Sequence, residues 1–353
     1  MNVNQLVAAI VASYETRQPI MGWGAPGVGK SSAGHQARDI LSMIYPATKA
    51  AKGKPANDEF GLIDLRLSLM DPVDLRGIPQ ITNGKAVWCR PSWLPTEGRG
   101  IIILEELVQA SPSMMAAASQ LVLDRMIGEH KLGDGWHVIA FGNRLSDRAA
   151  TNSMPTHVAN RFVHLYVEVS LESWVEWALK NGIDIRLVAF LKWRAALLHQ
   201  FDPQSKSQAF PSPRSWEFVS KQLGNKRLPA ALLPDMVKGT VGDGAAAEVL
   251  GFLRVFDQMP SIDSIRLNPT TAPIPTDPAT LYAVVTALSA GATVDNIGSI
   301  VIYFNRVTDE ASRPDFSIAA MKEISAGDDQ RKQKVANTKA FIEWAAKHSF
   351  VLS

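Results

Sequence analysis

The sequence predicts an α/β fold in which a parallel sheet is flanked by helices and followed by a helical C-terminal part. Three observations lead to this fold class. Short apolar runs alternate with helix-like segments over roughly the first 170 residues, which is typical of a parallel α/β core. Two turn signals interrupt that alternation, and beyond Ser170 the apolar residues recur only at helical spacing. With 353 residues, the chain has room for two or three domains.

The first part of the chain contains the elements expected to form the sheet and its covering helices. Asn4 is placed to cap a first helix, which Arg17-Gln18-Pro19 ends. The strand-like segments are residues 20–23, 62–67, 101–104, 136–141 and 163–167, and further helices are expected at residues 31–44 and 112–125. Residues 163–167 are expected to be the last strand of the core.

Two β-hairpins are expected within this part. Asn83-Gly84 lies between two apolar runs and is a typical signature of a type I′ turn. Gly133-Asp134-Gly135 separates residues 127–132 from residues 136–141 in a similar way. We therefore expect one hairpin turn at each of these two places.

The rest of the chain is predicted to be helical. Helix-like segments occur at residues 171–181, 185–199, 214–223, 232–239 and 245–259. A stretch rich in Pro and Thr, residues 268–278, marks a second boundary, and three further helices are expected in residues 279–353. The predicted domains are an α/β core of residues 1–169, a helical domain of residues 170–259 and a helical extension of residues 260–353.

Composition excludes several classes of protein. Hydrophobic residues make up 46% of the chain, so disorder is not expected to be its dominant state. The 36 basic and 34 acidic residues give a net charge of +2, which provides no general attraction to nucleic acid or to anionic membranes. A single cysteine, Cys89, excludes an internal disulfide framework. No apolar run is long enough to span a membrane and no basic signal-peptide start is seen, so a soluble, cytoplasmic protein is expected.

The strongest chemical signal is a G-x-x-x-x-G-K-S match after the strand at residues 20–23. Its members, with the serine that follows, are Gly24, Ala25, Pro26, Gly27, Val28, Gly29, Lys30, Ser31 and Ser32. In such a loop the backbone N–H groups face phosphate oxygens, Lys30 reaches the β- and γ-phosphates, and the Ser31 hydroxyl reaches Mg²⁺. A plain Gly-rich surface loop would leave the Lys-Ser pair unexplained. We therefore expect a nucleotide-binding site here.

Two carboxylates, Glu105 and Glu106, follow the strand at residues 101–104. In P-loop NTPases the first carboxylate of such a pair holds Mg²⁺ through water and the second polarises the attacking water. The first position is usually Asp, so Glu105 is a departure that puts metal affinity or turnover in doubt. The alternative is a helix N-terminus decorated with acidic residues.

Asn143 follows the strand-like residues 138–141 and completes the pattern. Taken alone, an Asn after a strand is usually a turn former. In order after the loop and the two acids, it is expected to orient the attacking water.

The ordered set of motifs resembles AAA+ ATPases of the MoxR family over residues 1–255. The motifs are the phosphate loop, the strand ending in Glu105-Glu106, Asn143, Val158-Ala159-Asn160-Arg161-Phe162, Phe210-Pro211-Ser212-Pro213-Arg214-Ser215-Trp216, the segment of residues 71–79, and Trp93-Leu94-Pro95. The resemblance implies that residues 170–259 are the helical lid. It also implies that the two hairpins face partners or a central pore. Trp88 and Trp93 on the first hairpin are candidate contacts, with packing in the core as the alternative for either.

The resemblance also implies roles for two arginines. Arg161 matches the arginine finger that enters a neighbouring subunit's site, with Arg144 and Arg148 as alternatives. Arg214 matches the sensor 2 arginine, which contacts the γ-phosphate within the same subunit. A surface salt bridge is the ordinary alternative for Arg161.

The function that the resemblance implies is a Mg²⁺-dependent ATPase that works as a ring, expected to be a hexamer, and remodels a protein client. The expected partner is a von Willebrand factor A-domain protein, and the implied activity is that of a chaperone. Two alternatives stay open. One is a nucleic-acid motor, which the near-neutral charge disfavours. The other is an ATP-gated scaffold with weak turnover, suggested by Glu105 in place of Asp.

Overall fold

The computed structural model describes residues 1–46, 59–147, 152–205, 207–257, 259, 261–293, 295–325, 333 and 336–347. The chain divides into two compact units. The first comprises Met1–Ser173, Phe201–Lys206 and Ser212–Arg214, and the second comprises Trp174–Gln200, Ser207–Pro211 and Ser215–Ser353. The predicted boundaries between core, lid and extension remain a prediction.

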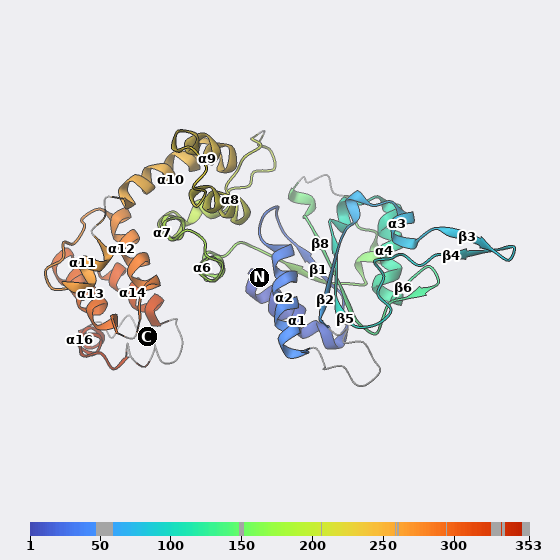
Figure 1. Cartoon of the computed structure of the whole chain (residues 1–353), viewed down its shortest axis with the longest axis horizontal. Coiled ribbons are helices and arrows are strands. Elements are labelled where there is room, and N and C mark those ends of the chain that lie inside the picture. Colours follow the sequence, from blue (N-terminus) through green and yellow to red (C-terminus); the bar gives the residue numbers. More distant parts are fainter. Residues whose placement is uncertain are drawn as a thin grey trace. The chain divides into compact units, whose positions relative to one another are not determined.

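The first unit is built on a five-stranded parallel sheet (Figure 1). Its strands are β1 (Ile20–Trp23), β2 (Gly61–Arg66), β5 (Arg99–Glu105), β8 (Gly135–Gly142) and β9 (Val163–Tyr166). Their order across the sheet is β2-β5-β8-β1-β9. Strands that are neighbours in space are separated in sequence by helical crossovers, as parallel pairing requires. The predicted α/β fold, a parallel sheet flanked by helices, is confirmed.

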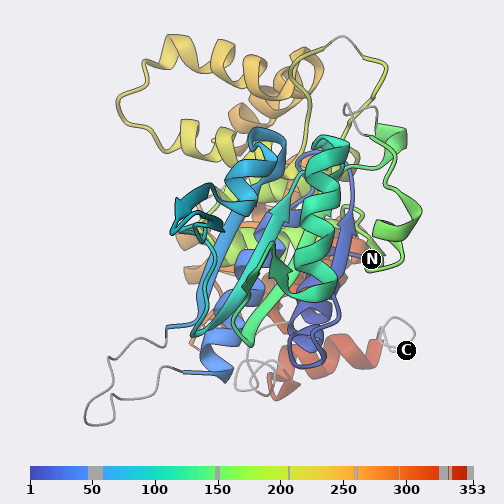
Figure 2. The same cartoon turned by 90° about the vertical axis from the view of Figure 1, so that its right-hand side faces the viewer.

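Helices cover both faces of this sheet (Figure 1 and Figure 2). On β5, Ile101 and Ile103 pack with α1 (Val3–Thr16) and α2 (Lys30–Ile44). The alternate residues, Ile102 and Leu104, pack with α3 (Pro72–Arg76), α4 (Pro112–Asp124) and α5 (Thr156–Ala159). Because side chains alternate between the faces of a strand, a run of apolar residues marks a strand buried on both sides. The cap predicted for α1 was wrong by two residues, since the Asn2 side chain, and not that of Asn4, accepts the Gln5 amide.

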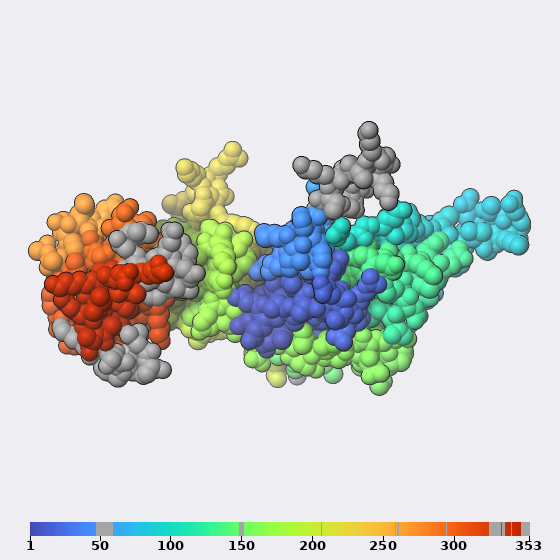
Figure 3. Space-filling model, turned by 90° about the horizontal axis from the view of Figure 1, so that it is seen from below, coloured from blue at the N-terminus to red at the C-terminus, as the bar shows by residue number. Residues whose placement is uncertain are grey.

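Two β-hairpins are inserted in this unit, one of them where it was predicted. β3 (Pro79–Thr82) and β4 (Lys85–Trp88) flank Asn83 and Gly84, whose φ angles of 52° and 73° fit a type I′ turn. This hairpin extends beyond the rest of the first unit in the space-filling view, where it is cyan (Figure 3). The second turn was predicted at Gly133-Asp134-Gly135, and that position is wrong.

The second hairpin turns instead at Gly128-Glu129, between β6 (Met126–Ile127) and β7 (His130–Lys131). Gly128 has a positive φ of 57°, which the turn requires. Gly135 serves a different purpose. A Cβ at Gly135 would lie 2.2 Å from the Gly98 carbonyl oxygen, so this glycine permits the close approach of β8 to β5.

The secondary structure in the described residues of the second unit is helical. Their helices are α6 (Leu171–Lys180, which begins in the first unit), α7 (Ile185–Trp193), α8 (Pro213–Leu223, whose first two residues belong to the first unit), α9 (Leu233–Val241), α10 (Asp243–Phe256), α11 (Ile262–Leu267), α12 (Pro278–Ala290), α13 (Ile297–Ala311), α14 (Pro314–Ser325) and α16 (Lys339–Lys347). Residues 279–353 were expected to form three helices, but four helices lie there among the described residues. A salt bridge of 2.8 Å between Lys192 of α7 and Glu323 of α14 ties the early and late helices together. Each helix in the described part of the chain is too short or too polar to cross a bilayer.

Candidate functional site

Three neighbouring strands end at the same edge of the sheet, and each is followed by a predicted site residue. β8 lies between β5 and β1, and all three run parallel. Glu105 is the last residue of β5, Asn143 comes directly after β8, and the Gly-rich loop comes directly after β1. The carboxyl ends of parallel strands are where α/β folds bind ligands.

The Gly-rich loop has the backbone shape that its glycines permit. Gly27 and Gly29 have φ angles of 78° and 99°, a region that other residues rarely adopt. The Gly24 amide donates to the Gly142 carbonyl at 3.3 Å, which ties the start of the loop to β8. Ala25 and Val28 are buried, whereas Pro26, Ser31 and Ser32 are partly exposed. α2 begins at Lys30, directly after the loop, and the N–H groups at the start of a helix favour an anion.

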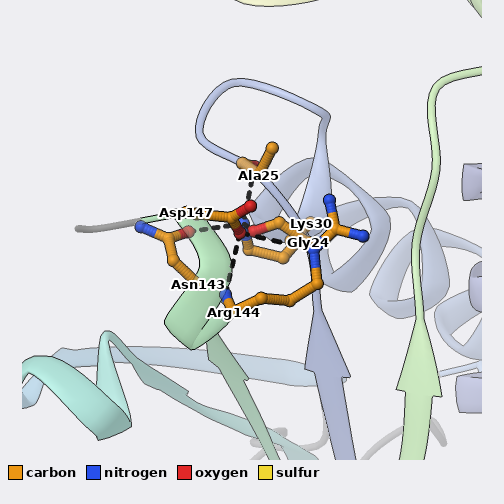
Figure 4. Close-up of polar contacts among 6 residues, drawn as sticks. All are labelled: Gly24, Ala25, Lys30, Asn143, Arg144 and Asp147. Atoms are coloured by element: carbon orange, nitrogen blue, oxygen red, sulfur yellow. Dashed lines mark hydrogen bonds and ion pairs between the residues drawn. The ribbon is translucent and has the colours of Figure 1, made fainter. Parts of the chain in front are cut away.

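The Lys30 ammonium group lies at the centre of the cluster (Figure 4). Its Nζ donates to the Gly24 carbonyl at 2.7 Å, the Ala25 carbonyl at 2.9 Å and Asn143 Oδ1 at 2.9 Å. Burial lowers the pKa of Lys30 to about 8, although the nearby carboxylates of Glu105 and Asp147 act in the opposite direction. Asn143 is therefore brought to the loop, as the strand order predicts.

Ser31 and Glu105 lie together, and their chemistry fits a magnesium ion. The Ser31 hydroxyl is hydrogen-bonded to the Glu105 carboxyl group, which is only 8% exposed. Glu105 Oε1 has no hydrogen-bond partner, and burial raises the pKa of this carboxyl. A hydroxyl and a carboxylate oxygen are ligands that Mg²⁺ accepts. Within the described ranges no cluster of three or more His, Cys, Asp or Glu could hold a metal, so phosphate and water would have to complete this site.

Glu106 is held by a residue that the sequence interpretation missed. The Ser68 hydroxyl, in the short 3₁₀ helix after β2, donates to Glu106 Oε2. Glu106 itself has a φ of 57°, an uncommon conformation for a residue other than glycine. The position of Ser68 in the sequence was the signal that could have identified it. Ser68 follows the strand next to β5, so it lies at the same edge of the sheet as the acids.

Asp147 is a second residue that was missed. This buried carboxylate accepts the Arg144 amide at 2.8 Å and the Arg144 Nε–H at 3.4 Å, which closes the turn after Asn143 (Figure 4). Arg144 is thus paired within its own chain. Arg148, the other alternative finger, lies outside the described residues.

The two predicted arginines lie in different places. Arg214 is at the start of α8, and a Cβ added at Gly27 would lie 3.8 Å from Arg214 Cβ. Its charge also contributes to the lowered pKa of Lys30. Arg161 instead donates to the Ser119 carbonyl of α4 at 2.7 Å. The structure therefore brings Arg214 to the Gly-rich loop, whereas the hydrogen bond of Arg161 is made to α4.

Comparison with known proteins finds similarity to solved structures only. No protein-family model matches the chain, and no curated protein does. One similar structure is NtrX from Brucella abortus, with 16% identity and a TM-score of 0.37 over 73% of this chain. The match covers 61% of the NtrX chain, so this chain spans about three fifths of its length. A second is a point mutant of RuvB from Thermotoga maritima, with 12% identity and a TM-score of 0.36 over 81% of each chain. With TM-scores below 0.5, these likenesses assign no function.

Proposed function

We propose that this chain is an AAA+ ATPase of the MoxR type that hydrolyses ATP at the loop of residues 24–31. The observation that carries the proposal is the convergence of Lys30, Asn143 and the Ser31–Glu105 pair at one edge of the sheet. A partly buried lysine, an amide and a carboxylate with an unpartnered oxygen form a set suited to a nucleoside triphosphate. A surface loop without a ligand would not need this arrangement.

Each residue of the cluster has a chemical role in this proposal. The loop amides and Lys30 neutralise charge on the phosphates, and Arg214 adds a second positive charge from the start of α8. Glu106 accepts a proton from the attacking water, and Asn143 orients that water. Ser31 and Glu105 would hold Mg²⁺, which, when bound, screens the charge of the phosphate oxygens.

The proposal includes assembly into a ring, expected to be a hexamer. Arg161 is bonded to α4 and not to the loop cluster of its own chain. In this proposal Arg161 exchanges its bond to the Ser119 carbonyl for the site of a neighbouring subunit, where its charge would stabilise the transition state. We further propose that the client is a protein, with a von Willebrand factor A-domain protein as partner. A nucleic-acid motor is disfavoured by the net charge of +2.

The first experiment measures ATP binding and Mg²⁺-dependent turnover of the whole chain over a wide range of protein concentration. Turnover per subunit should rise with concentration, because each site would be completed by a neighbour. Glu106→Gln should keep ATP affinity within about twofold and lower kcat by roughly 10²–10⁴-fold. Normal hydrolysis by that variant would refute the role of Glu106, and absence of ATP binding by the wild type would refute the function.

A second candidate, an ATP-gated scaffold with weak turnover, is favoured by one observation. Glu105 stands where Asp is usual, and its carboxyl is already hydrogen-bonded to Ser31. Glu105→Asp discriminates between the two functions. A gain of tenfold or more in kcat, roughly 1.4 kcal/mol in the barrier, would support the scaffold, and an unchanged or lower kcat would exclude it.

A further inference from the structure

His164 of β9 connects two parts of the first unit through its two ring nitrogens. The Trp23 Nε1–H donates to His164 Nδ1 at 2.8 Å, and His164 Nε2 lies 2.8 Å from the Ala159 carbonyl oxygen. The Trp23 and His164 rings are also stacked, with centroids 5.9 Å apart and an angle of 16° between their planes. Both side chains are half-buried.

These two contacts determine the tautomer of the imidazole. An indole N–H is only a donor, so Nδ1 of His164 must be the acceptor. The ring proton is then on Nε2, where it donates to the Ala159 carbonyl. A neutral imidazole of one tautomer satisfies both contacts, so the two hydrogen bonds are made together.

One end of this connection is the strand that leads into the Gly-rich loop. Trp23 is the last residue of β1 and directly precedes Gly24, whose carbonyl accepts a hydrogen bond from Lys30. A change in the loop when phosphate binds would therefore reach Trp23 through one peptide bond.

The other end is the segment that carries Arg161. Ala159 is the last residue of α5, and its carbonyl also accepts the Phe162 amide at 3.1 Å. The Arg161 amide donates to the Val158 carbonyl at 3.1 Å in the same turn. The turn of residues 158–162 thus depends on the carbonyl that His164 holds.

We propose that His164 is a positioning residue that couples the nucleotide-binding loop to the turn of residues 158–162, and so to Arg161. This inference rests on the proposed function and adds a route by which nucleotide at one site adjusts the arginine of the same subunit. If Arg161 acts on a neighbour, the Trp23–His164–Ala159 connection links two successive sites of the assembly.

The experiment is amide hydrogen exchange of the full chain with and without Mg²⁺ and a slowly hydrolysed ATP analogue. In the wild type, binding should slow exchange in residues 24–31 and also change exchange in residues 158–162, by about threefold or more. Trp23→Phe keeps an aromatic ring but removes the indole donor. It should retain the protection of residues 24–31 and lose the change in residues 158–162.

Two further variants make the test specific. His164→Asn retains an acceptor for Trp23 but has no donor that reaches Ala159, so it should also lose the change in residues 158–162. Each of Trp23→Phe and His164→Asn should also lower kcat, because each interrupts the connection to Arg161. The variant that carries both changes should lower kcat no further than either change alone. Trp136→Phe is the matched control, since Trp136 Nε1 donates to the Glu97 carbonyl at 2.9 Å, in the same unit but away from His164.

The outcomes separate the inference from the proposed function. If the wild type shows no protection of residues 24–31, the proposed function fails and the inference fails with it. If residues 24–31 are protected while residues 158–162 do not respond, the inference alone is wrong. Losses in kcat that multiply in the double variant, or an equal effect of Trp136→Phe, would also overturn it.

Discussion

At the scale of single residues, burial shifts the pKa values of two charged groups in the site toward their neutral forms. Lys30 is surrounded by protein to the extent that its pKa falls from 10.5 to about 8. Glu105, at the end of β5, has a raised pKa for the same reason. Burial therefore disfavours the charged form of both groups, and a ligand of opposite charge would favour that form again.

The pKa of Lys30 predicts how ATP affinity varies with pH. Below pH 8 the ammonium form dominates and can pair with phosphate, and above pH 8 the free protein loses this charge. The Kd for ATP should therefore rise with pH, by up to about fivefold from pH 8 to pH 9, because the ammonium fraction of the free protein falls from about one half to about one tenth. Calorimetric titration at pH 7, 8 and 9 measures this. Lys30→Arg, which stays charged, should lack the dependence, and a flat wild-type profile would contradict the prediction.

Ser68 provides a second residue-level prediction. Its hydroxyl donates to Glu106, which we expect to fix the carboxylate that accepts the proton of water. Ser68→Ala should lower kcat by about tenfold, a barrier change of about 1.4 kcal/mol, with ATP affinity unchanged. Ser68→Thr keeps the hydroxyl and should retain most of the activity. A higher kcat in Ser68→Ala would mean that the hydroxyl holds Glu106 away from the reaction.

At the scale of elements, the Gly-rich loop joins a strand to a helix through a backbone that other residues rarely adopt. Gly27 has a φ of 78°, and a Cβ there would lie 2.9 Å from Ser212 Oγ. The loop therefore needs glycine at this position for two reasons, one conformational and one steric.

Gly27→Ala tests this requirement. Forcing a Cβ into the left-handed region costs roughly 1–2 kcal/mol of stability. Gly128→Ala is the matched control, because Gly128 has a φ of 57° and open space around it. Both variants should lose stability in thermal melts, Gly27→Ala more because of its contact with Ser212, but only Gly27→Ala should weaken ATP binding by tenfold or more. Equal ATP affinity in the two variants would show that the shape of the loop does not matter.

Local signals in the sequence predicted single strands and turns better than they predicted which strands pair with each other. The apolar runs of β5 and β8 and the Asn83-Gly84 turn depend on nearby residues, and these predictions are confirmed. The second hairpin was misplaced because Gly128 and Gly133-Asp134-Gly135 are two turn signals within eight residues. Only the non-local pairing of β8 with β5 decides between them.

The same distinction applies to the candidate site. Lys30, Glu105 and Asn143 were predicted from their positions after strands, and the structure brings them together. Ser68 and Asp147 were missed because a lone serine or aspartate in a loop has no pattern of its own. Their contacts depend on the order of strands in the sheet and on a turn that closes on itself.

At the scale of the whole molecule, the proposed ring determines which variants can rescue each other. In a mixture of Arg161→Ala and Glu106→Gln, some interfaces combine an intact loop and Glu106 from one subunit with Arg161 from the other. Two nearly inactive variants should therefore recover activity on mixing, up to about a quarter of the wild-type turnover if sites act independently. The control is a mixture of two separate preparations of Arg161→Ala, which should stay inactive. No recovery would place Arg161 outside the neighbour's site.

The order of strands also has a consequence for how the chain is made. β1 is the first strand to be synthesised, but its partners are β8 and β9, which end at Gly142 and Tyr166. A nascent chain shorter than this leaves β1 with an unpaired edge, and long-range pairing of this kind is slow. The Gly-rich loop is therefore translated early, but the strands that flank β1 are available only much later. A ribosome-bound chain has to carry more than 160 residues beyond the exit tunnel before β1 has both of its neighbours.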